Sequence, residues 1–255
     1  MTFRRVFLVS IFINVWNLSF SQKPDSLAVT SHFGGAVTVT NNGISFIPNF
    51  TLGKPAAILD LNAGNRKLTF EPQLRFAMEG KPWSFIFWWR YKVVNNRKFK
   101  LTAGAHPALS FKNLTYTSNN DTTMTMIASR YLAAEIVPAY YLSDNISLGF
   151  YGFYARCLEK KSIRNTEMYA IRANFDKIGL GGKTYLRFAP QAYYLQMDQF
   201  DGYYVSASLG LAKGGYPFSV SVIANEPLKS NVPGGRDFVW NISLIYSFYS
   251  EFTRK

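Results

Sequence analysis

The sequence contains few of the residues that most metal sites and catalytic centres require. Among its 255 residues there is one cysteine, Cys157, and there are two histidines, His32 and His106. A single cysteine cannot form an internal disulfide, and so few, widely separated ligand side chains argue against a metal site. We therefore expect neither a metal ion nor another cofactor.

The chain also lacks an apolar run long enough for a membrane-spanning helix. The apolar run Val6–Trp16 has about half of the roughly 20 residues that such a helix needs. It follows Arg4 and Arg5 and precedes the small residues Ser19 and Ser21. This order is typical of a secretory signal. We expect cleavage after Ser21, which leaves residues 22–255 as one domain.

Acidic residues are scarce, at 15 against 28 lysines and arginines, and the net charge is +13. Cleavage would remove two arginines and no acid, so the net charge would fall to +11. A basic balance favours anionic partners, such as lipopolysaccharide phosphates, acidic sugars or small anionic solutes. The basic residues are dispersed and form no recognised binding motif, which argues against nucleic acid.

The chain is rich in segments that alternate apolar and polar residues with period two. In Phe238–Phe248, the residues Phe238, Trp240, Ile242 and Leu244 share one face, whereas Asn241, Ser243 and Ser247 dominate the other. Such alternation is typical of a β-strand with one apolar face. It predicts twelve strands: Phe33–Thr40, Ile44–Leu52, Lys67–Met78, Trp83–Val93, Phe99–Phe111, Thr125–Leu142, Ile146–Leu158, Glu167–Ile178, Thr184–Met197, Tyr203–Ala212, Phe218–Ala224 and Phe238–Phe248.

This pattern predicts an all-β protein, a closed antiparallel transmembrane β-barrel of about twelve strands. Bacterial single-chain barrels have an even number of strands, and aromatic residues, here 17%, form girdles at both membrane interfaces. A soluble sandwich is the weaker interpretation, because nearly every strand has an apolar face that a second sheet would have to cover. Ten or fourteen strands remain open, since Ala56–Leu61 would suit an extra strand, a small plug or a periplasmic excursion.

Connection lengths predict the orientation of the barrel. If both termini are periplasmic, Val94–Lys98, Ser143–Asn145, Gly179–Lys183 and Lys213–Pro217 are short periplasmic turns, and Lys112–Met124, Glu159–Thr166 and Asn225–Asp237 are longer outer loops. Two connections fit less well: Asn41–Gly43 is a very short outer turn, and Gly53–Arg66 is a long periplasmic one. We leave open whether Gly53–Arg66 folds into the lumen.

Five prolines fall inside predicted strands: Pro48, Pro72, Pro107, Pro138 and Pro190. Proline removes a donor from the hydrogen-bond ladder and normally belongs at edges or bulges. All five lie on the apolar side of the alternation, so they leave the pattern intact. We expect bulges or locally unpaired positions there.

Three segments resemble known barrels. PAYYLSDNISLGFYG, Pro138–Gly152, resembles the tight hairpin of small Gram-negative outer-membrane barrels, and FTLGKPA, Phe50–Ala56, and GKPWSFIFWWRYK, Gly80–Lys92, resemble segments of uncharacterised barrels from Bacteroidota. The resemblance implies an outer-membrane location, lipid and lipopolysaccharide as surroundings, and insertion by the barrel-assembly machinery. It implies no activity. The tail Thr253–Lys255 departs from the usual aromatic final residue.

In a barrel, residues facing lipid anchor the wall, and residues facing the lumen determine what enters. With the apolar side outward, the charged and titratable residues predicted to face the lumen are Glu71, Arg75, Arg90, Lys92, Lys100, His106, Glu135, Arg172, Asp176 and Arg187. They would form an anion-attracting constriction, or each base would pair with an acid and brace a narrow barrel. Inward tyrosines, among them Tyr151 and Tyr193, would narrow the channel.

Three function classes follow. The favoured one is a narrow passive channel or binding barrel for small anionic solutes, with no covalent step. The second is a structural or accessory barrel of an envelope complex with a closed lumen. The third is a lipid- or lipopolysaccharide-modifying enzyme, for which His106 or His32 would have to activate a serine. On the outer side, Lys160, Lys161, Arg164, Lys229 and Arg236 are candidates to neutralise lipopolysaccharide phosphates.

Overall fold

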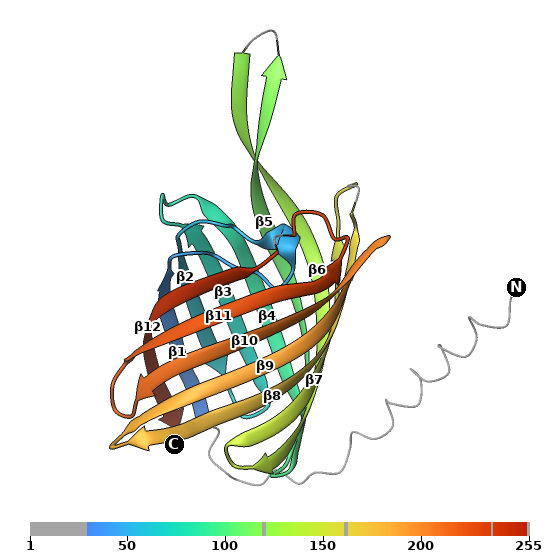
Figure 1. Cartoon of the computed structure of the whole chain (residues 1–255). Helices are drawn as coiled ribbons and strands as arrows, with labels where there is room; N and C mark the ends of the chain where they lie inside the picture. Colours follow the sequence, from blue (N-terminus) through green and yellow to red (C-terminus); the bar gives the residue numbers. More distant parts are fainter. Residues whose placement is uncertain (1–29, 119–120, 161–162, 236, 254–255) are drawn as a thin grey trace, which may run out of the picture.

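The chain folds into one closed β-barrel, shown in Figure 1. We use a computed structural model that describes residues 30–118, 121–160, 163–235 and 237–253. Each strand pairs antiparallel with its neighbours in sequence, and β1 closes the barrel against β12. The strands are β1 (Thr30–Thr40), β2 (Ala56–Gly64), β3 (Leu68–Ala77), β4 (Pro82–Asn95), β5 (Phe99–Ser118), β6 (Asp121–Ser143), β7 (Ile146–Cys157), β8 (Asn165–Gly181), β9 (Thr184–Met197), β10 (Phe200–Lys213), β11 (Phe218–Ser230) and β12 (Val239–Thr253).

The predicted fold class and the total of twelve strands are confirmed, but one of the twelve was misplaced. Ile44–Leu52 is not a strand: it lies in the connection between β1 and β2, where Pro48–Phe50 forms a short 3₁₀ helix, η2. The missing strand is β2, which contains the ambiguous segment Ala56–Leu61. The error has a physical cause, because the apolar residues of Ile44–Leu52 pack inside the barrel and so mimic a strand facing lipid.

This correction removes both connections that fitted poorly. Thr30 and Thr253, the first and last described residues, pair at one end of the barrel, where the turns 65–67, 96–98, 144–145, 182–183 and 214–217 are all short. The longer connections 41–55, 158–164 and 231–238 lie at the other end, called the loop end below. The β5–β6 hairpin projects far beyond this end (Figure 1), so most of the predicted loop Lys112–Met124 continues the two strands.

The outward alternation is confirmed on the wall of the barrel. On β12, four side chains are each between 42% and 53% exposed: Trp240, Ile242, Leu244 and Tyr246. The intervening residues Asn241 and Ser243 are buried. The neighbouring strands continue this apolar surface with Val37 and Val39 on β1 and Val220 on β11. Soluble monomers rarely expose apolar patches beyond a few hundred Å². The outer surface is therefore suited to lipid.

Four of the five in-strand prolines lie where the pairing is interrupted, as predicted. On one side of its strand, each of these prolines and one adjacent residue have no partner in the ladder. This holds for Pro72 between β2 and β3, Pro107 between β4 and β5, Pro138 between β6 and β7, and Pro190 between β8 and β9. Each proline keeps its partner on the other side. The fifth, Pro48, begins η2 rather than lying in a strand, and this position suits its missing N–H.

Candidate functional site: the lumen

The connection 41–55, called the internal loop below, is fastened to opposite walls near the loop end of the barrel. The Trp83 indole N–H on β4 donates to the Phe50 carbonyl at 2.8 Å, and the Tyr193 hydroxyl on β9 donates to the Phe46 carbonyl at 3.0 Å. The Ile242 amide on β12 donates to the side chain of Asn41 at 2.8 Å. Because these strands lie on different sides of the barrel, the loop reaches across the lumen (Figure 1).

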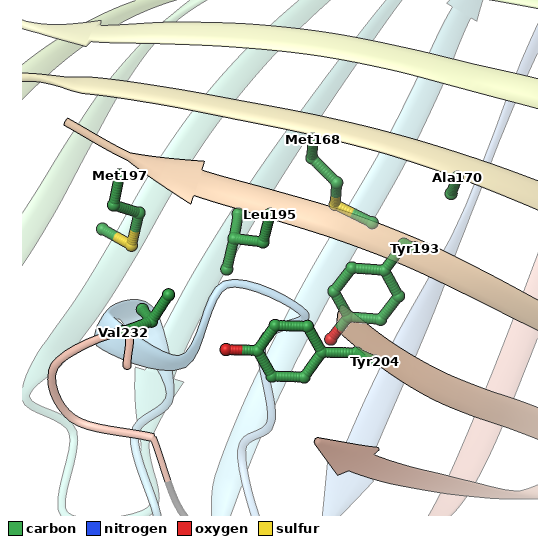
Figure 2. Close-up of a cluster of buried hydrophobic side chains, with 7 residues drawn as sticks. All are labelled: Met168, Ala170, Tyr193, Leu195, Met197, Tyr204 and Val232. Carbon is green, nitrogen blue, oxygen red and sulfur yellow. The ribbon is translucent and has the colours of Figure 1, made fainter. Parts of the chain in front are cut away.

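An apolar cluster holds the internal loop against one wall. Figure 2 shows its buried members on β8, β9 and β10 and in the 231–238 connection: Met168, Ala170, Tyr193, Leu195, Met197, Tyr204 and Val232. Phe46 and Ile47 of the loop pack against them. The rings of Tyr193 and Tyr204 stack with centroids 4.8 Å apart. This part of the lumen is filled with side chains.

The Tyr193 hydroxyl joins the loop to two walls, since it also contacts Asn225 Oδ1 at 2.8 Å. We expect Tyr193→Phe to destabilise the barrel by about 1–3 kcal/mol, because it leaves buried polar groups without partners. Urea unfolding of the detergent-solubilised protein measures the loss. Tyr194→Phe, which changes a hydroxyl on the lipid side, is the matched control, and equal stability of the two variants would contradict this anchoring role.

A cluster of charged side chains from β3, β4 and β6 lies on the inner wall of the barrel. Arg90 on β4 pairs with Glu71 on β3, and its Nε donates to Glu135 on β6 at 2.5 Å. The Glu135 side chain is only 1% exposed. Strand β5 lies between β4 and β6, and its Gly104 pairs with both Arg90 and Glu135. A Cβ at Gly104 would approach Glu135 Oε1 to 2.9 Å, so glycine leaves the space in which the ion pair forms.

Two other arginines lie in the lumen without an ion pair among the described residues. Arg75 Nη2 donates to Gln73 at 2.9 Å, and its Nε is buried with no hydrogen-bond partner. Arg172 donates from Nε and Nη2 to the side-chain oxygen of Gln191, at 2.9 and 2.7 Å. Asp60 on β2 is near enough to Arg75 to interact electrostatically, but the two are not hydrogen-bonded. Neither arginine thus makes a direct ion pair with a described carboxylate.

Aromatic side chains line the lumen beside these charges. The rings of His106, Trp88 and Phe153 contact one another, and the His106 centroid is 4.0 Å from that of Trp88 and 6.3 Å from that of Phe153. The Arg90 guanidinium lies over the Trp88 ring at 4.3 Å, and Tyr151 stacks on Phe153 at 6.1 Å. These rings come from β4, β5 and β7 and lie on one side of the barrel.

The loop, the arginines and the rings enclose a cavity of about 450 Å³. Its lining includes Arg75, Arg90 and Arg172 together with His106, and no aspartate or glutamate among the described residues. The carboxylates of Asp60, Glu71 and Glu135 lie outside this lining. Pockets that bind small molecules commonly have volumes of 300–1,000 Å³. The cavity is therefore large enough for a small ligand and presents positive charge to it.

The ten predicted lumen residues do not form one ring. Six lie near the middle of the barrel: Glu71, Arg75, Arg90, His106, Glu135 and Arg172. Lys92 lines a second cavity, of about 740 Å³, at the end that carries the termini, together with His32, Arg66 and Glu251. Lys100 lies over the Tyr141 ring at 4.2 Å. Asp176 and Arg187 line a small pocket on the β8–β12 side.

Of the predicted outer-loop residues, Lys160, Arg164 and Lys229 lie at the loop end of the barrel, and Lys161 and Arg236 are outside the described residues. The predicted signal peptide is also outside them. Beside these lysines, the hydrogen bond from Arg130 to Glu159, at 2.8 Å, holds the pKa of Glu159 down to about 2. That carboxylate therefore stays charged throughout the physiological range.

Sequence reasoning missed Gly104, Trp88 and the internal loop. The signal for Gly104 was the small-residue stretch Ala103–Ala105, which leaves room on β5. Within the described part of the chain, no three His, Cys, Asp or Glu side chains are grouped so that they could hold a metal ion. No helix among the described residues is long and apolar enough to cross a membrane.

A closed antiparallel barrel with an apolar outer band and a polar interior is the architecture of bacterial outer-membrane proteins, and the fold defines this chain as a transmembrane β-barrel. No protein-family model and no curated protein sequence matches it. Among solved structures, it is similar to OmpT, an outer-membrane protein of Vibrio cholerae, with 10% identity and a TM-score of 0.46, covering 90% of this chain and 100% of that one.

It is also similar to the β domain of the Bordetella autotransporter BrkA, with 8% identity and a TM-score of 0.43, covering 86% of this chain and 99% of that one. A third similarity is to OccAB3 of Acinetobacter baumannii, with 11% identity and a TM-score of 0.41, covering 89% of this chain and 66% of that one. Neither the fold nor the function argued below depends on these similarities.

Proposed function

We propose that this protein is an outer-membrane barrel that binds small anionic solutes in its lumen and passes them slowly, as a narrow passive channel. The observation that carries the proposal is the central cavity, whose lining has three arginines and no described carboxylate. Charged side chains lining a pore select ions of opposite sign. No covalent step is required, and we propose neither a cofactor nor a metal.

The selectivity belongs mainly to Arg75 and Arg172. Arg90 is neutralised by Glu71 and Glu135, so its main effect is to brace the wall. Lys92, Lys100 and Arg187 lie nearer the termini and would attract anions to the inner mouth of the barrel. The two roles predicted for the inward-facing basic residues, attracting anions and bracing the wall, are thus proposed for different residues.

The test is a planar-bilayer measurement on the purified mature protein in a potassium chloride gradient. We expect small discrete currents and a reversal potential of the sign that indicates anion preference. In the double variant Arg75→Gln, Arg172→Gln the ratio of anion to cation permeability should fall roughly threefold or more, since charged residues lining a pore set its selectivity. Lys213→Gln, at the end of β10, is the control and should leave the ratio unchanged. An unchanged ratio in the double variant would refute the assignment.

A second candidate is a structural barrel that carries nothing. The observation that favours it is the internal loop, which fills part of the lumen and is fastened to three strands. Complete electrical silence of the wild type, together with silence after the loop is shortened, would favour this candidate. The enzyme hypothesis ranks last: His106 packs against the rings of Trp88 and Phe153, and Ser110 lies four residues away on the same strand.

A further inference from the structure

We infer that the central cavity takes a particular class of anion: a small monocarboxylate whose body is flat and apolar, rather than an inorganic anion. This inference rests on the proposed function and narrows its ligand. It comes from the distribution of charge and of aromatic rings around the cavity.

The polar part of the cavity is built for one carboxylate. The side chains of Arg75, Arg90 and Arg172 line the cavity, and no aspartate or glutamate among the described residues lines it with them. Arginine presents N–H groups in a planar fork that matches two carboxylate oxygens. Arg172 is positioned by Gln191 and adds a second guanidinium to the same lining.

Aromatic rings form much of the remaining lining, beside the polar side chains of Ser45, Gln73, Ser84 and Ser110. The Phe153 ring stacks on Tyr151 and lies tilted against Trp88, and Phe46 and Phe50 of the internal loop also line the cavity. Aromatic rings attract other flat rings by offset or edge-to-face contacts, which are worth about 0.5–1.5 kcal/mol beyond their buried area. A bare inorganic anion would leave the rings uncovered.

The size and charge of the cavity limit the ligand further. Its volume of about 450 Å³ suits a molecule with a single ring or a short fused system. Glu71 and Glu135 neutralise Arg90, which leaves less positive charge to hold the second charge of a dianion. The geometry therefore favours one negative charge at one end of a flat apolar body.

The experiment measures binding to the purified, detergent-solubilised barrel by calorimetry and by the fluorescence of its tryptophans, one of which, Trp88, lines the cavity. The probes are benzoate, its neutral analogue benzamide, acetate and inorganic phosphate. We expect benzoate to bind at least tenfold more tightly than each of the other three. Phe153→Ala should weaken benzoate at least fivefold and leave acetate unchanged. Arg172→Gln should weaken benzoate at least tenfold and leave benzamide unchanged.

The other possible results separate an error in the ligand class from an error in the proposed function. If acetate and phosphate bind as tightly as benzoate while the bilayer retains its anion preference, the ligand class is wrong and the proposed function stands. If benzamide equals benzoate, the carboxylate assignment is wrong. If no anion binds and the bilayer shows no anion preference, the proposed function fails as well. Lys213→Gln, outside the cavity, should bind benzoate as the wild type does. If it weakens benzoate as much as Arg172→Gln does, binding reflects the overall positive charge of the barrel and the cavity assignment is wrong.

Discussion

Replacing residues 44–51 by a two-residue glycine–serine turn should raise the single-channel conductance roughly threefold or more, because the internal loop is the main obstruction in the lumen. Backbone hydrogen bonds already join the two ends of the loop: the Leu52 amide donates to the Gly43 carbonyl at 2.9 Å, and the Gly43 amide donates to the Lys54 carbonyl at 2.9 Å. The excision therefore needs no rearrangement of β1 or β2. It removes Phe46, Ile47 and Phe50 from the lumen, and planar-bilayer recording measures the change.

The matched control for the excision is Lys54→Gln, which breaks the exposed ion pair with Glu79 at the base of the same loop and leaves its lumen segment in place. Its conductance should equal that of the wild type. Heat-dependent migration on a gel checks that both variants are folded barrels. Unchanged conductance in a folded excision variant would mean that the lumen is closed elsewhere, and the channel proposal would lose its physical basis.

Arg90→Gln should destabilise the barrel by about 3–5 kcal/mol, the typical cost of removing one partner from a buried ion pair. The variant leaves the carboxylates of Glu71 and Glu135 near one another with no opposing charge, and the Glu135 side chain is 1% exposed. Urea unfolding of the detergent-solubilised protein at neutral pH measures the loss. We expect a lower urea midpoint with little change in the denaturant slope.

Two comparison variants make this stability test specific. Arg187→Gln makes the same substitution at a solvent-exposed arginine on β9 and should cost little. The triple variant Arg90→Gln, Glu71→Gln, Glu135→Gln should recover much of the loss, because a fully neutral set leaves no uncompensated charge. If Arg90→Gln is as stable as Arg187→Gln, the cluster does not brace the wall, and Arg90 would have to be counted with the selectivity residues.

Much of the fold could be predicted from the sequence because a transmembrane barrel imposes one rule on every strand. Lipid contacts one face, so residues such as Trp240 and Leu244 on β12 alternate with Asn241 and Ser243. The same rule explains the one misplaced strand. Phe46 and Ile47 are apolar because they pack on Met168 and Tyr193 inside the lumen, and periodicity does not distinguish the two environments.

The function of the predicted site stays a prediction, but the inward placement of several of its residues can be compared with the structure. Alternation placed Arg75, Arg90 and Arg172 on the inner side, where they line one cavity. It could not show that Arg90 reaches Glu135 across β5, because that contact depends on the register of three strands and on the missing side chain of Gly104. Asp60 was missed with its strand β2, although it is the acid that interacts with Arg75.

The proposed anion site is the cavity beneath the internal loop, which Arg75 and Arg172 line without a direct ion pair to a described carboxylate. The most direct measurement is the reversal potential of the loop-excised barrel in a potassium chloride gradient, with and without Arg75→Gln and Arg172→Gln. In the excised barrel the internal loop no longer restricts the passage of ions by size. The sign of the reversal potential therefore reports the charge of the cavity lining. We predict anion preference that is lost in the double variant. Cation preference, or an anion preference that survives the loss of both arginines, would contradict the account.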